Sequence, residues 1–425
     1  YFNHIRQINM MDGTITVDAG VSIKTLREKL HGMHLDIPIL TAQDNDATIG
    51  AIVATKSSTP TSFAHSTIRE WVEGLTIIVD SGEEHHIKDG ITPSGRLLGI
   101  YQAIFPILTA SAPTLRAMRP ELADDATGYC LWNTSIGPRQ LIDQLVGSEG
   151  TLGILTSVTL RVVPHKQYIT TICIPLSESR LISTCVDTAK HHKAEHIFLY
   201  DDVFMELVDR YHLHSIPSFP DAKYTITISF FDTSKEILDA KVRNFTRAVS
   251  LDEKTFAYYD SKYFIERITD PAFLFSLLHS YTQGSHTPIT TTSGIVVPLP
   301  MYEKILHDID TYLYSTGKFY SITGNAGSGH ISLVTLLDHN SKNYAGELLH
   351  YTQTIFSYVK KYKGGISAHS GDGLSRTPYI PMFYNEATMD VFTTIKKAWD
   401  PYHILNPGKK VDGNPNYLNN HLKSA

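Results

Sequence analysis

The sequence predicts an α+β fold with two or three domains, and three observations support this prediction. The chain has 425 residues, more than the roughly 250 to 300 that a single hydrophobic core usually serves. Strand and helix patterns alternate through its second half, as in α/β or split βαβ layers. Near residue 150, a turn with glycines at a spacing of three leads into an alternating strand.

The first half begins with a strand-helix unit. Residues 14–19 alternate as a strand, and Ser22 is expected to cap a helix whose apolar residues share one face. Residues 74–79 and 85–87 form a predicted hairpin. Residues 88–128 are rich in Pro, Gly and Ala and carry no clear prediction.

The second half contains regularly spaced strands with helical stretches between them. The predicted strands lie near 169–175, 195–200, 223–231, 254–259, 289–297 and 319–323. We therefore expect one domain at 1–167, a second at 168–390, and a return of the chain to the first domain at 391–425.

Composition narrows the function. The chain has 37 basic and 43 acidic residues, a net charge of −6, and no basic run, so nucleic acid is not an expected partner. Three cysteines without a CxxC pair are typical of a reducing compartment, which favours the cytoplasm. The longest apolar region, near 100–115, is expected to be broken by Pro106 and Pro113 and is shorter than the ~20 residues of a membrane helix. No transmembrane segment is expected.

The most informative segment is GSEGTLGILT, residues 147–156. Three glycines at this spacing suit neither an ordinary helix nor a strand, and each costs folding entropy. The functional interpretation is that peptide groups here approach a flat or phosphate-bearing ligand closely. The alternative is a tight turn before a sheet strand.

This segment resembles the signature of the FAD-linked oxidases, whose flavin domain is of the p-cresol methylhydroxylase type and which include D-lactate dehydrogenases and the flavin subunit of glycolate oxidase. Further stretches agree in the family's order: ATIGAIVAT (47–55), TIREWVEGL (67–75), GGISAHSGDGLSRTPYIP (364–381) and IKKAWDPYHILNPGKKVD (395–412). The resemblance implies an incomplete FAD-binding domain, lacking its amino-terminal pyrophosphate loop, with a ferredoxin-like α/β domain capping the substrate.

By this resemblance, FAD is the expected cofactor, held by peptide N–H groups, hydroxyls and apolar walls. The family's pattern is altered at Ala51, Lys56 and Ser66, where relatives have glycine, asparagine and glycine. The expected cofactor-binding residues are Thr48, Ile49, Gly50, Thr55, Ser58, Thr67, Gly147, Ser148, Glu149, Gly150, Thr151, Gly153, Ile154 and Asn406.

The metal and base site departs from the family. Relatives that oxidise D-2-hydroxy acids bind a divalent metal through two histidines and a glutamate, with a further histidine as the base. Here Asn325 and Ser332 replace the two histidines, His369 replaces the glutamate and Ser370 replaces the base. Asparagine is a poor zinc ligand, and serine has no useful pKa near neutrality.

Two histidines in this region are the remaining candidates. Imidazole titrates near neutral pH, so His330 and His369 are candidates for a zinc or manganese site or for the base. Arg376 is the candidate for the substrate carboxylate, which guanidinium binds bidentately. The alternative is that both histidines are ordinary members of a chain with 21.

The leading hypothesis is an FAD-dependent dehydrogenase of a small D-2-hydroxy acid such as D-lactate. Electrons would pass to a quinone, a cytochrome or a protein acceptor, and a homodimer and attachment to the inner face of a membrane are left open. The alternative is a flavin-binding relative without activity that serves as a subunit or scaffold. A nicotinamide enzyme is disfavoured because no GxGxxG follows a strand and opens a helix.

Overall fold

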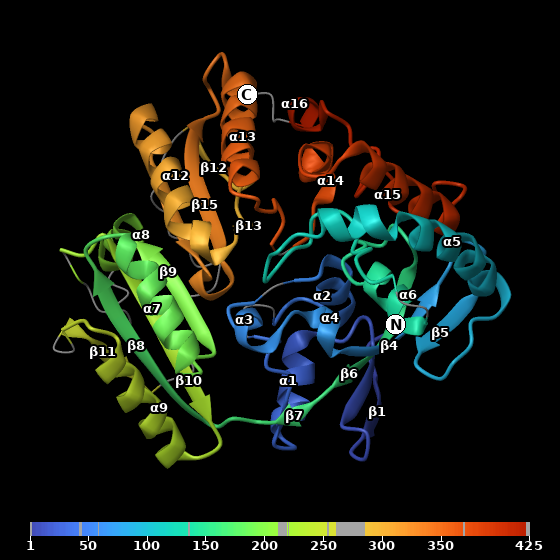
Figure 1. Cartoon of the computed structure of the whole chain (residues 1–425), viewed down its shortest axis with the longest axis horizontal. Coiled ribbons are helices and arrows are strands. Elements are labelled where there is room, and N and C mark those ends of the chain that lie inside the picture. Colours follow the sequence, from blue (N-terminus) through green and yellow to red (C-terminus); the bar gives the residue numbers. More distant parts are fainter. Residues whose placement is uncertain are drawn as a thin grey trace.

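The computed structural model contains two large β-sheets that lie beside each other, each covered by helices (Figure 1). It is 42% helical and 22% strand, so the α+β prediction is confirmed. The structure describes residues 2–41, 45–57, 59–134, 137–210, 219, 221–252, 255–260, 285–368 and 370–421.

The first sheet has five strands in the order β1-β2-β6-β4-β5. All neighbouring pairs are antiparallel. The central strand is β6, which follows the glycine-rich turn as predicted. The strands are β1 (Ile5–Asn9), β2 (Thr14–Asp18), β4 (Val72–Ile78), β5 (Glu84–Lys88) and β6 (Ile154–Arg161).

Short helices and a small two-stranded sheet surround the first sheet. Ser22 caps α1 by accepting a hydrogen bond from the N–H of Thr25, which confirms the predicted helix start. β3 pairs with β7 in an antiparallel manner. The elements are α1 (Ile23–His31), β3 (Leu35–Asp36), α2 (Ile49–Thr55), α3 (Ser62–His65), α4 (Ile68–Trp71), α6 (Pro138–Leu145) and β7 (Val163–Pro164).

One long helix, α5 (Gly95–Met118), runs without a break through both Pro106 and Pro113. The prediction that these prolines interrupt the apolar region was wrong. Each proline removes one helical hydrogen bond, but buried side chains from Leu97 to Leu115 and packing against α15 (Glu386–Trp399) stabilise the helix. In the described part of the chain, α5 alone is long and apolar enough to cross a membrane, a criterion that core helices of soluble proteins also meet.

The second sheet confirms the ferredoxin-like prediction. Its first four strands lie in the order β11-β8-β10-β9, followed by β14, β15 and β12, with β13 paired to β15. Helices α7 and α9 follow β8 and β10, which is the βαββαβ arrangement. The strands are β8 (Tyr168–Leu176), β9 (His196–Asp201), β10 (Tyr224–Asp232), β11 (Ala257–Tyr259), β12 (His286–Ile289), β13 (Ile295–Val296), β14 (Tyr320–Gly324) and β15 (His330–Asp338).

Two differences from the predicted strands stand out. The strand expected at 289–297 is divided into β12 and β13, and the nine-residue β15 was not predicted. One face of the sheet packs against α7, α9, α12 and α13, and α8 covers the other. These helices are α7 (Arg180–His191), α8 (Asp202–Arg210), α9 (Lys235–Ala248), α12 (Tyr302–Thr316) and α13 (Tyr344–Lys361).

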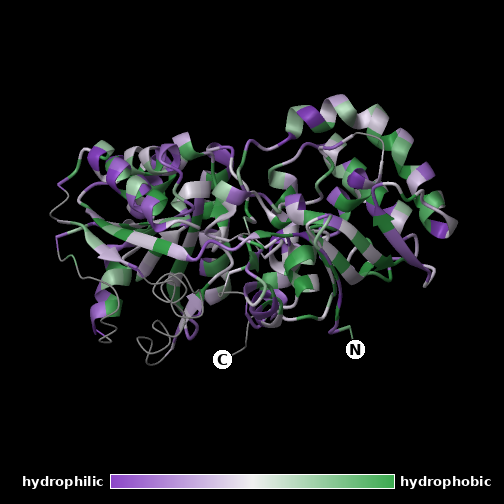
Figure 2. Ribbon diagram, turned by 90° about the horizontal axis from the view of Figure 1, so that it is seen from below, coloured by the Kyte–Doolittle hydropathy of each residue, from purple (hydrophilic) through white to green (hydrophobic). Residues whose placement is uncertain are grey.

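The chain then returns to the first sheet. Ile380, Phe392 and Trp399 are buried in the same core as the strands and helices of residues 5–163. Strands of both sheets are banded in green and paler colours, as expected where alternate residues face a core (Figure 2). The short helices α14 (Gly373–Arg376) and α16 (Tyr417–His421) lie near this return. The domain division at 167 and 390 stays a prediction.

Candidate functional site

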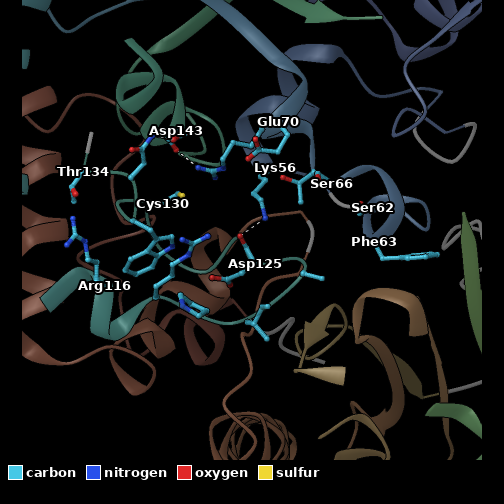
Figure 3. Close-up of a pocket in the computed structure, with 18 residues that line it drawn as sticks. Lys56, Ser62, Phe63, Ser66, Glu70, Arg116, Asp125, Cys130, Thr134 and Asp143 are labelled. Carbon is cyan, nitrogen blue, oxygen red and sulfur yellow. Dashed lines mark hydrogen bonds between the residues drawn. The ribbon is translucent and has the colours of Figure 1, made fainter. Parts of the chain in front are cut away.

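A cavity of about 700 Å³ lies beside the carboxyl end of α2 (Figure 3). Its lining mixes side chains from three stretches far apart in sequence, residues 56–70, 116–134 and 143. Four cations contribute to it, namely Lys56, Arg69, Arg116 and Arg119. The remaining lining includes the acids Glu70, Asp125 and Asp143 as well as Thr67, Cys130 and Trp132.

Lys56 is the most deeply placed of these cations. It ends α2 in the left-handed conformation, with φ of 49°, and only 5% of its surface is exposed. Its ammonium donates a hydrogen bond to the carbonyl of Asp125 at 2.6 Å. Burial lowers the pKa of Lys56 and raises the pKa of Asp125. A buried ammonium at a cavity wall is suited to an anionic ligand.

The glycine-rich turn packs directly against α2. The N–H groups of Gly147 and Glu149 donate to the carbonyls of Val53 and Ala54, at 2.9 and 2.7 Å. A Cβ atom on Gly147 would lie 3.1 Å from the Cβ of Lys56. Two of the stretches expected to bind the cofactor, α2 and the glycine-rich turn, are therefore packed against each other. The N–H groups of Gly147 and Glu149 are used in this contact.

A buried ion cluster joins the same turn to the two carboxyl-terminal motifs. The ammonium of Lys410 lies 3.0 Å from the carboxylate of Glu149 and 2.8 Å from that of Asp372. Glu149 also accepts hydrogen bonds from the N–H groups of Asp372 and Gly373, at 2.6 and 2.9 Å. The amide of Asn406 donates to the Glu149 carbonyl at 2.6 Å.

Glu149 and Lys410 stabilise each other's charged forms. Burial alone would raise the pKa of Glu149, but Lys410 and the two N–H groups outweigh it and lower that pKa. Burial would lower the pKa of Lys410, but Asp372 and Glu149 outweigh it and raise that pKa. This cluster thus joins three motifs, those at 147–156, 364–381 and 395–412.

The other expected cofactor residues have defined places. The Thr48 hydroxyl caps α2 by accepting from the N–H of Ala51, and the Thr55 hydroxyl donates to the Ala51 carbonyl at 2.7 Å. Gly50 is needed for close contact with Ala19, whose carbonyl oxygen would be 2.8 Å from an added Cβ. Ile49 is buried.

Around the turn itself, burial varies. Ser148 and Thr151 are buried, and the Thr151 hydroxyl shares a 2.7 Å hydrogen bond with Tyr129. Gly153 is backed by the carbonyl of Ile78, whereas Ile154 is 53% exposed. Among the expected cofactor residues, Thr67 lines the cavity. Ser58 lies outside the described residues.

The candidate substrate residue Arg376 is held by the protein itself. Its guanidinium donates to the carbonyls of Thr291 and Ile366, each at 3.1 Å, and to that of Ser293. This geometry favours a structural role that joins the 364–381 motif to the second sheet. It gives no support to the expected contact with a substrate carboxylate.

The candidate base and metal ligand His330 begins β15 and is 5% exposed. Its Nε2 atom lies 3.4 Å from the Ser332 hydroxyl. Over the described residues, His330 belongs to no group of three or more metal-ligating side chains. His369 lies outside the described residues. The described side chains therefore do not fit a metal at this position.

Asn325, which stands at a metal-ligand position expected from the resemblance, contacts the segment that precedes α3 instead. Its amide nitrogen donates to the carbonyl of Thr59 at 3.0 Å. Its amide oxygen is buried without a hydrogen-bond partner. The loop that holds a metal in relatives here packs between the two sheets.

The part of the cavity formed by residues 116–134 was not predicted from the sequence. Arg116 lies at the end of α5, and Arg119 and Trp132 follow it. Arg116 and Arg119 belong to the stretch at 88–128 that carries no clear prediction, and no motif marks Trp132.

Comparison with known proteins identifies the family. The model for the carboxyl-terminal domain of FAD linked oxidases matches residues 166–410, and that for an FAD binding domain matches residues 1–88. The chain is 23% identical to "D-2-hydroxyglutarate dehydrogenase" of Pseudomonas putida, covering 96% of this chain and 42% of that protein.

Two further likenesses agree. The chain is 23% identical to "Probable D-lactate dehydrogenase, mitochondrial" of Danio rerio, over 95% of this chain and 73% of that one. A solved structure of alkyldihydroxyacetonephosphate synthase shares the fold, with a TM-score of 0.62 at 15% identity, covering 96% of this chain and 67% of the other. The chain therefore belongs to the FAD-linked oxidases, a family whose cofactor is FAD.

Proposed function

We propose that this chain forms part of a dehydrogenase that oxidises a D-2-hydroxy acid of the D-lactate or D-2-hydroxyglutarate type. The family and the names of the relatives support an FAD-linked oxidoreductase. The substrate is the part that we propose. The chain spans less than half of the Pseudomonas relative, so the activity of the whole protein is also a proposal.

The observation that carries the proposal is the position of the cavity. It lies at Lys56, where α2 and the glycine-rich turn meet, and both stretches belong to the family's flavin motifs. A volume of about 700 Å³ falls within the usual range of ligand and cofactor sites, roughly 300 to 1,000 Å³. The cations at its wall suit a ligand that carries a pyrophosphate.

These residues fit FAD. Lys56 and Thr67 would hold it, with Arg116 and Arg119 adding positive charge. In such an enzyme the flavin supplies the two-electron acceptor. The chain's own part is to bind the anionic cofactor, to exclude water by the packing of the turn against α2, and to position a base near the substrate.

Of the two candidates for the base, His330 is the one that lies among the residues that the structure describes. Its imidazole is buried, and the Ser332 hydroxyl lies near its Nε2 atom, so a proton could move at that atom. His369 stays a second candidate. The acceptor of the electrons is proposed to be a cytochrome, since a relative from Saccharomyces cerevisiae is named "D-lactate dehydrogenase [cytochrome] 1, mitochondrial". A cytoplasmic location stays a prediction.

The second candidate function is a flavin-binding subunit without dehydrogenase activity. The contact of Asn325 with Thr59 favours it, because a protein contact replaces a metal ligand of relatives. The commitment of Arg376 to three carbonyls also favours it.

The test is anaerobic titration of the FAD-loaded protein with the D and L forms of lactate and 2-hydroxyglutarate. The proposed function predicts loss of the flavin's visible absorbance with one D acid and not with its L form. His330→Ala should slow this step by about a hundredfold to ten-thousandfold, and the exposed His350→Ala should not. A bound flavin that keeps its absorbance with all four acids would establish the second candidate.

A further inference from the structure

Three metal-ligating side chains that belong to none of the cofactor or metal motifs described above converge at one place. His31 is the last residue of α1, Asp36 lies in β3, and His165 directly follows β7. One ligand atom from each lies within 4.8 Å of the others. Over the residues that the structure describes, no other group of three or more such side chains meets this criterion.

The backbone fixes this convergence. Asp36 pairs with Val163 in the β3–β7 ladder, and the N–H of His165 donates to the carbonyl of His34 at 2.9 Å. The turn that follows α1 is therefore tied to the strand that leads into the second sheet. The centroids of the two imidazole rings lie 4.3 Å apart, and the planes of the rings are inclined to each other by 36°.

The spacing of the ligand atoms suits a tetrahedral ion. The Nε2 atom of His31 lies 3.5 Å from one oxygen of Asp36, and the Nδ1 atom of His165 lies 3.2 Å from the other. In a tetrahedral zinc site with bonds of about 2.0 to 2.1 Å, neighbouring ligand atoms are roughly 3.3 Å apart. In the structure, the Nδ1 atom of His165 shares a hydrogen bond with Asp36, whose other oxygen accepts from the N–H of Ile37. Binding of one ion would replace the first of these contacts and draw together ligand atoms that already lie within 4.8 Å of one another.

The surroundings of the His31 side chain also favour a bound cation. Its Nε2 atom is buried and faces the Asp36 carboxylate at 3.5 Å without forming a hydrogen bond, which is costly for a polar atom. A bound cation would satisfy this lone pair. The three side chains are 29%, 16% and 18% exposed, so an ion can reach them and a water molecule can complete its coordination.

We propose that His31, Asp36 and His165 bind one zinc ion. Two imidazoles and a carboxylate are a ligand set that zinc prefers, whereas magnesium and calcium prefer oxygen ligands alone. The ion would fasten α1 to the connection between the two sheets. Its role is structural and does not depend on the proposed dehydrogenase activity.

The test measures zinc binding by the untagged, chelator-treated protein. Calorimetric titration should show one site with a Kd tighter than about 10 μM. Cobalt in place of zinc should give the visible absorption of a tetrahedral site. His31→Ala and His165→Ala should each weaken this site by at least roughly a hundredfold, more than loss of an outer-shell partner does.

A matched control distinguishes this site from general binding by surface histidines. His191 is also the last residue of a helix, α7, and is exposed, so His191→Ala should bind zinc as the wild type does. Asp36→Asn provides a further variant that keeps the side chain's shape. Zinc should raise the Tm of the wild type and of His191→Ala only.

The proposal is overturned by either of two results. One is the absence of a zinc site tighter than about 10 μM in the wild-type protein. The other is equal zinc affinity in the wild type and in the His31, Asp36 and His165 variants, which would place any bound zinc elsewhere.

Discussion

The glycine-rich turn at 147–153 and the loop at 324–332 both contain closely spaced glycines, but the space around these glycines differs. A Cβ atom on Gly150 would find its nearest neighbour, the Asn406 amide, 3.9 Å away. A Cβ atom on Gly324 or Gly329 would overlap with a backbone carbonyl oxygen, that of His330 or Val297, and one on Gly327 would overlap with the ring of Phe63.

The difference separates one position of the turn, Gly150, which keeps open space in front of it, from a loop whose glycines are enclosed by protein. The other two glycines of the turn, Gly147 and Gly153, are backed closely by Lys56 and Ile78. The turn is anchored from behind by the Glu149–Lys410–Asp372 cluster. The loop packs against Phe63 in α3 and against Thr59, which precedes it. The glycine-rich turn is thus joined to the two carboxyl-terminal motifs, while the loop at 324–332 forms a contact between the two sheets.

The largest effect is expected from removing the anchor of the turn. Lys410→Met leaves the buried carboxylates of Glu149 and Asp372 without their cation, and loss of one partner of a buried ion pair costs about 3 to 5 kcal/mol. Chemical denaturation should show a decrease of this size in the free energy of unfolding. Lys409→Met is the control. Equal stability of the two variants would show that the ion cluster does not anchor the glycine-rich turn.

An added methyl group in the tightly packed loop at 324–332 should lower the stability of the protein. Gly324→Ala places a Cβ against the carbonyl of His330, and overpacking of this kind costs about 1 to 3 kcal/mol. Gly99→Ala in α5, where the nearest atom is 4.0 Å away, should instead be neutral or slightly stabilising. A fully stable Gly324→Ala protein would show that the loop is not tightly packed.

Acid should weaken the anchor gradually. Because the pKa of Glu149 is lowered in the folded state, its contribution is present above the unfolded value of about 4.3 and is lost as pH falls below it. Glu149→Gln should therefore be less stable than the wild type at pH 7, and the difference between the two should shrink as the pH falls through the lowered pKa of Glu149. Glu28→Gln, at an exposed site, should follow the wild-type curve, and parallel curves for Glu149→Gln would contradict this assignment.

Much of the fold follows from local sequence patterns. The alternation of β6, the cap at Ser22 and the spacing of β8 to β11 were all readable, because period and capping are local properties. The continuous α5 was not, since its packing against α15 overrides the local effect of Pro106 and Pro113. β15 was missed because its first residues resemble a catalytic motif and not an ordinary strand.

The site could be predicted only in part for a similar reason. The motifs locate the wall formed by α2 and the turn, but they do not show that Arg376 binds three carbonyls or that Arg116 and Arg119 reach the cavity. The cluster of His31, Asp36 and His165 has no sequence signature, because it depends on the pairing of β3 with β7.

FAD affinity in two glycine variants tests the central claim most directly. Gly150 and Gly317 have similar φ values, +72° and +64°, and both have open space in front of them, so alanine introduces similar backbone strain at each. Gly150 lies in the turn and Gly317 ends α12. If the turn keeps its space for the flavin, Gly150→Ala should weaken FAD binding by at least about tenfold, or 1.4 kcal/mol, and Gly317→Ala should match the wild type. Equal FAD affinity in all three proteins would contradict the account.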